Sequence, residues 1–284
     1  MASEAEAAYT AAVHTAYGID VAQDLKGALH HLQVAAELGH RPAQTELAAL
    51  VGNWRLAREI TSGKQSGLEI WERLRAAVDM AAWLNVPAGR PLSAEPRIAM
   101  VKRFISAPAC DWLVSVGMPH LQRAQTIDPD SGETTADGAR TNSSAEFLPP
   151  LIDTMVAFVR ARLAALAGVS TSALETSQLM HYAVGEQFGP HYDFLNVRHA
   201  GYARQVAQHG QRALTALIYL NENYADGETF FPKLSRGFKG RKGDALIFWN
   251  VTPDGAPDPR TLHMGSAPTS DEKWLFSQWI RLRV

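Results

Sequence analysis

The hydrophobic pattern of this chain changes from a helical to a strand-like period near Glu175, and that change limits the folds that it can adopt. Before Glu175, apolar residues recur at the three- and four-residue spacing of amphipathic helices, for example over 25–39 and 151–167. After it, short apolar runs alternate with turns of Gly, Pro and Asp. These runs cover 178–184, 213–220, 244–249 and 274–282. Helices followed by short strands predict an α+β protein, with a jelly-roll (double-stranded β-helix) barrel backed by helices.

Composition is that of an ordinary soluble globular protein. The chain has 284 residues, of which 46% are hydrophobic and 20% are charged, so it can bury a sizeable core. Its net charge is −2 and its Lys and Arg residues are scattered, so we expect no nucleic-acid partner. No apolar run approaches the roughly 20 residues that span a bilayer, and the N-terminus does not resemble a signal peptide, so we expect no membrane association. The single cysteine, Cys110, fits a reducing compartment, and we expect a cytoplasmic protein.

A stretch rich in Pro and Gly, residues 85–96, predicts a boundary between two parts of the chain. We expect residues 1–92 to form an all-helical segment and residues 93–284 to form the barrel domain. Within the helical segment, residues 17–50 resemble one Sel1-type repeat, a relative of the tetratricopeptide helical hairpins. Stacked repeats generally need about three units to bury a continuous core, so this single unit is expected to pack against the rest of the protein.

A candidate metal site lies in the last third of the chain. His191 and Asp193 are two positions apart in a strand-like run, so their side chains point to one face, and His263 on a later strand can supply a third ligand. Two imidazoles and one carboxylate, with the remaining positions open, are the ligands of non-haem Fe(II) oxygenases. Lys273, ten residues after His263, begins a strand-like run where its ammonium can hold a dicarboxylate co-substrate. Taken singly, each residue also fits an ordinary strand-end or loop position, but the set in this order favours the metal site.

Five segments resemble, in order and approximate spacing, the prolyl 4-hydroxylase family of Fe(II)/2-oxoglutarate-dependent dioxygenases. They are residues 182–194, 212–221, 226–232, 242–248 and 261–274. A short motif, Arg140-Thr141-Asn142-Ser143, also resembles a family motif beside the active site. The resemblance covers residues 96–284, approximately the whole predicted barrel domain.

The resemblance implies roles for individual residues. His191, Asp193 and His263 would ligate Fe(II), and Lys273 would bind the distal carboxylate of 2-oxoglutarate. The same pocket would be completed by two hydroxyl groups and an indole, from Tyr182, Thr229 and Trp279. Because charge-assisted hydrogen bonds to a carboxylate are strong, a lysine with hydroxyl groups is a suitable clamp. Plain strand packing is the alternative for Tyr182, Thr229 and Trp279.

On the substrate side the resemblance implies roles for Arg140, Phe188 and Arg212. Phe188 stands where many relatives have tyrosine, which removes one hydroxyl from this side of the pocket. Residues 197–211 are interpreted as a loop between two strands that flank the metal, placed to close over the substrate or simply to connect the strands.

The implied reaction is hydroxylation of an unactivated carbon with release of succinate and CO2, using Fe(II), 2-oxoglutarate and O2, with ascorbate as reductant. The carboxylate at Asp193 favours hydroxylation, because related halogenases have a small residue there. The substrate would be a free amino acid or a proline-like residue in a peptide or protein. The alternative is a catalytically idle barrel that acts as a protein-binding scaffold. The N-terminal helices would then bind a protein partner, whereas in an enzyme they either do so or only cover the barrel.

Overall fold

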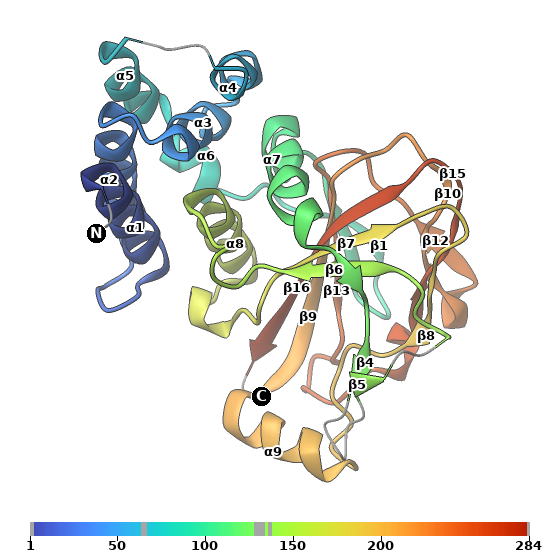
Figure 1. Ribbon diagram of the computed structural model, residues 1–284. Coiled ribbons are helices and arrows are strands. Elements are labelled where there is room, and N and C mark those ends of the chain that lie inside the picture. Colours follow the sequence, from blue (N-terminus) through green and yellow to red (C-terminus); the bar gives the residue numbers. More distant parts are fainter. Residues whose placement is uncertain (1–2, 64–66, 128–133, 136–137, 283–284) are drawn as a thin grey trace.

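The computed structural model describes residues 3–63, 67–127, 134–135 and 138–282 (Figure 1). The N-terminal part is helical. Its helices are α1 (Glu4–Tyr17), α2 (Leu25–Glu37), α3 (Arg41–Leu50), α4 (Trp54–Thr61), α5 (Glu69–Ala77) and α6 (Met80–Leu84). Short polar side chains begin most of them: Ser3, Asp24, Asn53 and Asp79 each accept a hydrogen bond from a backbone amide of the first turn. None of the helices formed by the described residues is long and apolar enough to cross a membrane.

Two further helices, α7 (Ala107–Gly117) and α8 (Thr154–Ala167), separate the N-terminal helices from the strands (Figure 1). Helix α8 is buried on nearly all sides because it contacts α1, α2, α3, α6 and α7. It ends at Gly168, whose φ of 67° is a left-handed conformation that glycine adopts without steric cost. The helices predicted over 25–39 and 151–167 are confirmed as α2 and α8.

Within the described residues, the large antiparallel sheet has eight strands in the order β1-β2-β13-β9-β16-β7-β6-β3. Their bounds are Arg90–Ser93 (β1), Ile98–Val101 (β2), Ala245–Trp249 (β13), Gln211–Tyr219 (β9), Lys273–Leu282 (β16), Gln178–Tyr182 (β7), Ser143–Glu146 (β6) and Gln122–Arg123 (β3). A smaller sheet has the order β12-β11-β14-β8. Its strands are Arg236–Phe238 (β12), Thr229–Phe231 (β11), His263–Gly265 (β14) and Phe188–His191 (β8). Short pairs join β10 (Ala225–Asp226) to β15 (Pro268–Ser270) and β4 (Thr126–Ile127) to β5 (Thr134–Thr135).

The chain passes back and forth between the two sheets. Strand β7 lies in the large sheet, β8 in the small one, β9 in the large one, β11 and β12 in the small one, and β13, β14 and β16 continue the alternation. All the pairings are antiparallel. This winding is a jelly roll, and the predicted α+β fold with a double-stranded β-helix backed by helices is confirmed.

Side chains of β16 alternate between two cores. Lys273, Leu275, Ser277 and Trp279 line a cavity, whereas the intervening Trp274, Phe276 and Ile280 belong to the core shared with the helices. The cavity lies between the sheets, because its other lining residues come from β7 and β9 on one side and from β8, β11 and β14 on the other.

The interpretation of residues 197–211 as a loop is wrong. They form helix α9 (Ala200–His209), which stands below the sheets in Figure 1 and buries no side chain. Its Ala, Gln and Arg residues have favourable helix propensity, and Gly210 (φ 82°) ends it.

The predicted boundary between residues 92 and 93 falls within β1. The division of the chain into two domains at this point stays a prediction.

Candidate active site

Three side chains with metal-ligating atoms meet at one end of the cavity. His191 ends β8, Asp193 follows it by two residues, and His263 begins β14, where it pairs directly with His191 across the strands. One ligand atom from each residue lies within 4.8 Å of the others. Nε2 of His191 is 3.6 Å from Oδ1 of Asp193, and Nε2 of His263 is 3.5 Å from Oδ2 of Asp193. The structure therefore brings together the three residues that the sequence predicted, as a facial triad.

Backbone carbonyls orient both imidazoles. Nδ1 of His191 is 2.8 Å from the carbonyl oxygen of Gly189, and Nδ1 of His263 is 3.0 Å from that of Thr261. Each Nδ1–H donates to its carbonyl, so each Nε2 presents a lone pair to the centre. Burial and the neighbouring His263 lower the pKa of His191 to about 3, which keeps this imidazole in the neutral form that binds metal. Neutral nitrogens with one carboxylate are a suitable donor set for Fe(II).

Lys273 lies in the same cavity as the triad. It is fully buried, it pairs with Tyr182 across the sheet, and its Nζ lies 4.5 Å from the Tyr182 ring centroid. Among the described residues Nζ has no hydrogen-bond partner. Burial lowers the pKa of Lys273 from 10.5 to about 7. A buried ammonium without such a partner is costly, so this cavity fits a ligand that carries a carboxylate.

Tyr182, Thr229 and Trp279 line the cavity with Lys273, as expected from the sequence. Nε1 of Trp279 is buried and has no hydrogen-bond partner in the described part of the chain. Gly265 on β14 leaves room for Tyr182, because a Cβ atom there would lie 2.9 Å from the tyrosine Oη. The rest of the wall includes apolar side chains, from Met180, Leu217 and Leu275.

Phe188 and Arg140 lie against the triad. The Phe188 ring stacks on His191 with centroids 3.6 Å apart and planes 10° from parallel, and the Arg140 guanidinium carbon is 4.4 Å from the Phe188 centroid. Arg140 is 8% exposed and donates to the Gln125 carbonyl at 3.0 Å and the Asn142 side chain at 3.3 Å. Both predicted substrate residues therefore touch the cavity, although most of each side chain is used in packing.

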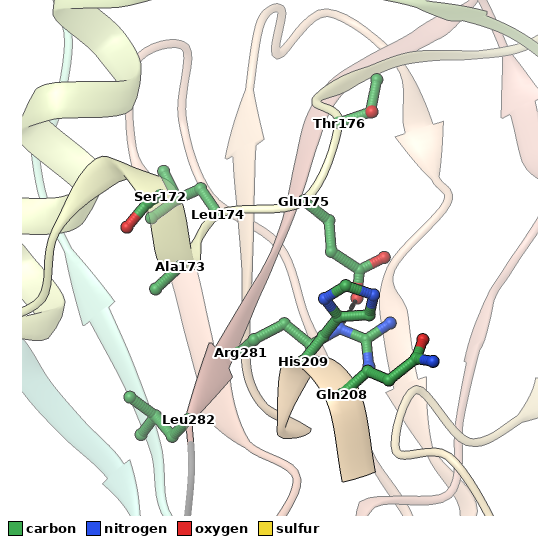
Figure 2. Close-up of a pocket in the computed structure, with 9 residues that line it drawn as sticks. All are labelled: Ser172, Ala173, Leu174, Glu175, Thr176, Gln208, His209, Arg281 and Leu282. Carbon is green, nitrogen blue, oxygen red and sulfur yellow. Dashed lines mark hydrogen bonds and ion pairs between the residues drawn. The ribbon is translucent and has the colours of Figure 1, made fainter. Parts of the chain in front are cut away.

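Arg212, the third predicted substrate residue, is held by two partners. Its guanidinium carbon lies 3.7 Å from the Trp279 ring centroid, and it donates to both carboxylate oxygens of Glu175 at 2.7 and 2.8 Å. Arg281 donates to the same carboxylate at 2.5 Å. Figure 2 shows Glu175 and Arg281 in the wall of an open pocket, between the segment that follows α8 and the end of α9. Contacts therefore run from this pocket through Glu175 and Arg212 to Trp279 in the metal cavity.

Sequence reasoning missed Glu175 and two other residues, Thr215 and Asn250. The Thr215 hydroxyl donates to Asp193 at 2.7 Å, and the Asn250 amide donates to that hydroxyl at 2.9 Å. The strand period places Thr215 on the same face of β9 as Leu217, which is a usable signal. No pattern in the sequence points to Glu175 or Asn250, because their partners lie 35 or more residues away along the chain.

A jelly roll with two imidazoles, one carboxylate and a buried lysine in its cavity defines the class of non-haem Fe(II) dioxygenases. The family model described as the 2OG-Fe(II) oxygenase superfamily matches residues 177–281. Among curated relatives, probable prolyl 4-hydroxylase 6 of Arabidopsis thaliana is 35% identical over 212 residues, covering 68% of this chain and 71% of that protein. Probable prolyl 4-hydroxylase 10 of the same plant is 30% identical over 210 residues, covering 67% and 71%.

The chain belongs to the prolyl 4-hydroxylase-like family of 2-oxoglutarate- and Fe(II)-dependent dioxygenases. A viral collagen prolyl hydroxylase from Paramecium Bursaria Chlorella virus-1, solved with 2-oxoglutarate, matches with a TM-score of 0.48 and 23% identity. That match covers 66% of this chain and 96% of the viral one. The predicted enzyme class and the predicted use of Fe(II) and 2-oxoglutarate are confirmed, whereas the roles of individual residues stay predictions.

Proposed function

We propose that this dioxygenase hydroxylates a prolyl residue within a peptide or protein. The use of 2-oxoglutarate as co-substrate is supported by Lys273, whose buried ammonium lies in the same cavity as the triad. The choice of a prolyl residue as substrate is supported by the relatives named prolyl 4-hydroxylases. When bound, Fe(II) with 2-oxoglutarate and O2 supplies the oxidant that attacks an unactivated carbon, and succinate and CO2 are released.

His191 and His263 would contribute Nε2 to the metal and Asp193 would contribute a carboxylate oxygen. The co-substrate and O2 would take the positions that these three residues leave open. Because the carbonyl oxygens of Gly189 and Thr261 fix both rings, the donors need little reorganisation when metal binds.

Lys273 binds the distal carboxylate of 2-oxoglutarate in this proposal. The hydroxyls of Tyr182 and Thr229 would donate to the same carboxylate, and Trp279 lines the same cavity. The apolar side chains of Leu217 and Leu275 exclude water from this clamp, which strengthens the ion pair.

Arg212, Arg140 and Phe188 form the substrate side. Glu175 and the Trp279 ring hold the Arg212 guanidinium in place, so it presents a fixed cation beside the metal cavity.

A peptide substrate also needs room for the residues that flank the reacting proline. The pocket beside Glu175, about 750 Å³, offers that room. Helix α9 borders the same pocket and is the element that we expect to close over the peptide.

The α2–α3 hairpin is proposed to be the Sel1-type repeat, and to bind a protein partner. Its Ala residues are buried where the helices meet, as small residues in such hairpins are. Trp54, at the start of α4, and Leu68, just before α5, are 56% and 66% exposed, so each offers a partner an apolar side chain. Replacing both with Ser is expected to abolish partner co-purification without changing 2-oxoglutarate turnover; unchanged co-purification would refute this role.

The function is tested by measuring succinate release with Fe(II), ascorbate and either proline-containing peptides or free amino acids. We expect peptides to gain the mass of one oxygen atom in step with succinate, and Lys273→Met to lose both. Oxygen transfer to free amino acids alone would contradict the peptidyl substrate. Absence of turnover with either pool would instead support the idle scaffold.

A further inference from the structure

A buried chain of side-chain hydrogen bonds lies behind the triad. Thr215 Oγ1 donates to Asp193 Oδ2 at 2.7 Å, and Asn250 Nδ2 donates to Thr215 Oγ1 at 2.9 Å. Thr215 is 1% exposed, Asn250 is 0% exposed and Asp193 is 4% exposed, so water does not compete for these bonds. Nothing in the family match assigns Thr215 or Asn250 a role.

The chemistry of the three groups fixes the direction of these bonds. An ionised carboxylate only accepts hydrogen bonds, so the single hydroxyl proton of Thr215 points to Asp193. The Thr215 oxygen then has lone pairs free to accept a bond, and the Asn250 amide supplies the donor. Asn250 therefore holds the Thr215 hydroxyl in the one orientation that serves Asp193.

The backbone on both sides holds this chain of bonds rigidly. Thr215 lies in the middle of β9, between partners on β13 and β16. Asn250 directly follows β13. Its backbone N–H donates to Ala213 at 2.9 Å, and its carbonyl accepts from the Asp258 N–H at 2.9 Å. The hydroxyl and the amide are thus set by the sheet.

Both oxygens of Asp193 face the metal position. Oδ1 is 3.6 Å from Nε2 of His191 and Oδ2 is 3.5 Å from Nε2 of His263, so geometry alone would allow either oxygen or both to ligate. The hydrogen bond from Thr215 distinguishes them, because it occupies a lone pair of Oδ2 only. A carboxylate that ligated through both oxygens would take a coordination position that the co-substrate or O2 needs.

We propose that Thr215 and Asn250 are positioning residues that keep Asp193 bound to the metal through Oδ1 alone. The inference rests on the proposed Fe(II) and 2-oxoglutarate site. A purely stabilising role is a poorer explanation for an asparagine at position 250, because the buried Oδ1 of Asn250 has no hydrogen-bond partner in the described part of the chain. Such an unsatisfied group costs free energy of folding, and local costs of this kind concentrate at functional sites.

The test uses the full chain loaded with Mn(II), which binds without turning over. Thr215→Val removes the hydroxyl at nearly constant volume, and Thr215→Ser is the matched control that keeps it. We expect the dissociation constant of 2-oxoglutarate to rise at least tenfold in the Val variant and to change less than threefold in the Ser variant. A crystal structure of the Mn(II)-loaded Val variant should show both Asp193 oxygens on the metal.

The outcomes distinguish a failure of this inference from a failure of the proposed function. If Mn(II)-loaded wild-type protein does not bind 2-oxoglutarate, the proposed site itself is wrong. If wild type binds and the Val variant binds equally well, with only its melting temperature lowered, Thr215 is structural and the positioning role is refuted. Should Thr215→Val not fold, Asn250→Ala makes the same test by removing only the amide that orients the hydroxyl. An unchanged dissociation constant in Asn250→Ala would also overturn the proposal.

Discussion

At the scale of single residues, Lys273 carries its ammonium into the barrel interior, where burial lowers its pKa to about 7. At pH 8 the ligand-free protein therefore holds this side chain mostly neutral. A dicarboxylate beside it favours the charged form and raises the pKa again. Binding should consequently take up a proton at pH 8 and almost none at pH 6, where the lysine is already charged.

This proton uptake is measurable by calorimetry of 2-oxoglutarate binding to Mn(II)-loaded protein, in buffers of different ionisation enthalpy. We expect uptake of up to one proton at pH 8 and little at pH 6. Lys273→Met is the control, with weak binding and no uptake at either pH. Equal uptake at the two pH values would show that another group titrates.

Asp193 is the one anionic ligand of the triad, and its loss leaves two neutral imidazoles. Asp193→Ala is expected to abolish hydroxylation and to raise the Mn(II) dissociation constant by about 100-fold or more. Asp254→Ala, which removes an exposed carboxylate from a turn, is the matched control and should change neither. Wild-type turnover by Asp193→Ala would refute the ligand assignment.

At the scale of elements, helix α8 begins with two buried carboxyl groups. Asp153 caps the helix by accepting from the Val156 amide at 2.7 Å, and Glu46 of α3 accepts from the Met155 amide at 2.7 Å. The Thr154 hydroxyl also donates to Glu46. Burial and the nearby Asp153 raise the pKa of Glu46 from 4.5 to about 8, and burial raises that of Asp153 to about 6.

Because the pKa of Glu46 is raised, its contact with the start of α8 weakens as pH rises. Between about pH 4.5 and 8 the folded state binds more protons at Glu46 than the unfolded state does, so this contribution to the free energy of unfolding falls across that window. The decline is at most about 1.4 kcal/mol per pH unit for one group. Glu46→Gln keeps an acceptor and cannot ionise, so its advantage over wild type should grow from pH 5 to pH 8 in denaturant titrations. Exposed Glu69→Gln should show no such trend, and a constant difference for Glu46→Gln would contradict the assignment.

At the scale of the whole molecule, the N-terminal helices and the large sheet share one hydrophobic core. Leu47 and Trp71 belong to the same buried cluster as Phe104, Leu179 and Phe276. Arg162 of α8 also links these parts by hydrogen bonds. It donates to the carbonyl of Phe104 and to the carbonyls of Ala82 and Trp83 in α6. The sheet therefore presents one face to the cavity and the other to helices that all precede residue 168 in the sequence.

We expect the full chain to unfold in a single transition, because a shared core couples the parts on either side of residues 92 and 93. Denaturant curves followed by far-UV circular dichroism and by tryptophan fluorescence should coincide. Two separate transitions would instead favour the predicted division into a helical segment and a barrel domain that unfold independently.

The sequence by itself determined the fold class and the positions of the triad. The helical and strand periods are carried by neighbouring residues, so the change near Glu175 is readable without any long-range contact. The same holds for His191 and Asp193, which the two-residue period places on one face. His263 and Lys273 were found from their order and spacing along the chain, and the family resemblance supported both.

Only the tertiary structure decided what surrounds those residues. The hydrogen bonds of Thr215 and Asn250, and the pairing of Arg212 with Glu175, join residues far apart along the chain, and depend on strand register and on how loops meet at the barrel mouth. Helix α9 was missed although its Ala, Gln and Arg residues favour a helix, and it buries no side chain in the core. Local periodicity is a property of neighbours, whereas the partner of a buried polar group is fixed only when distant segments pack together.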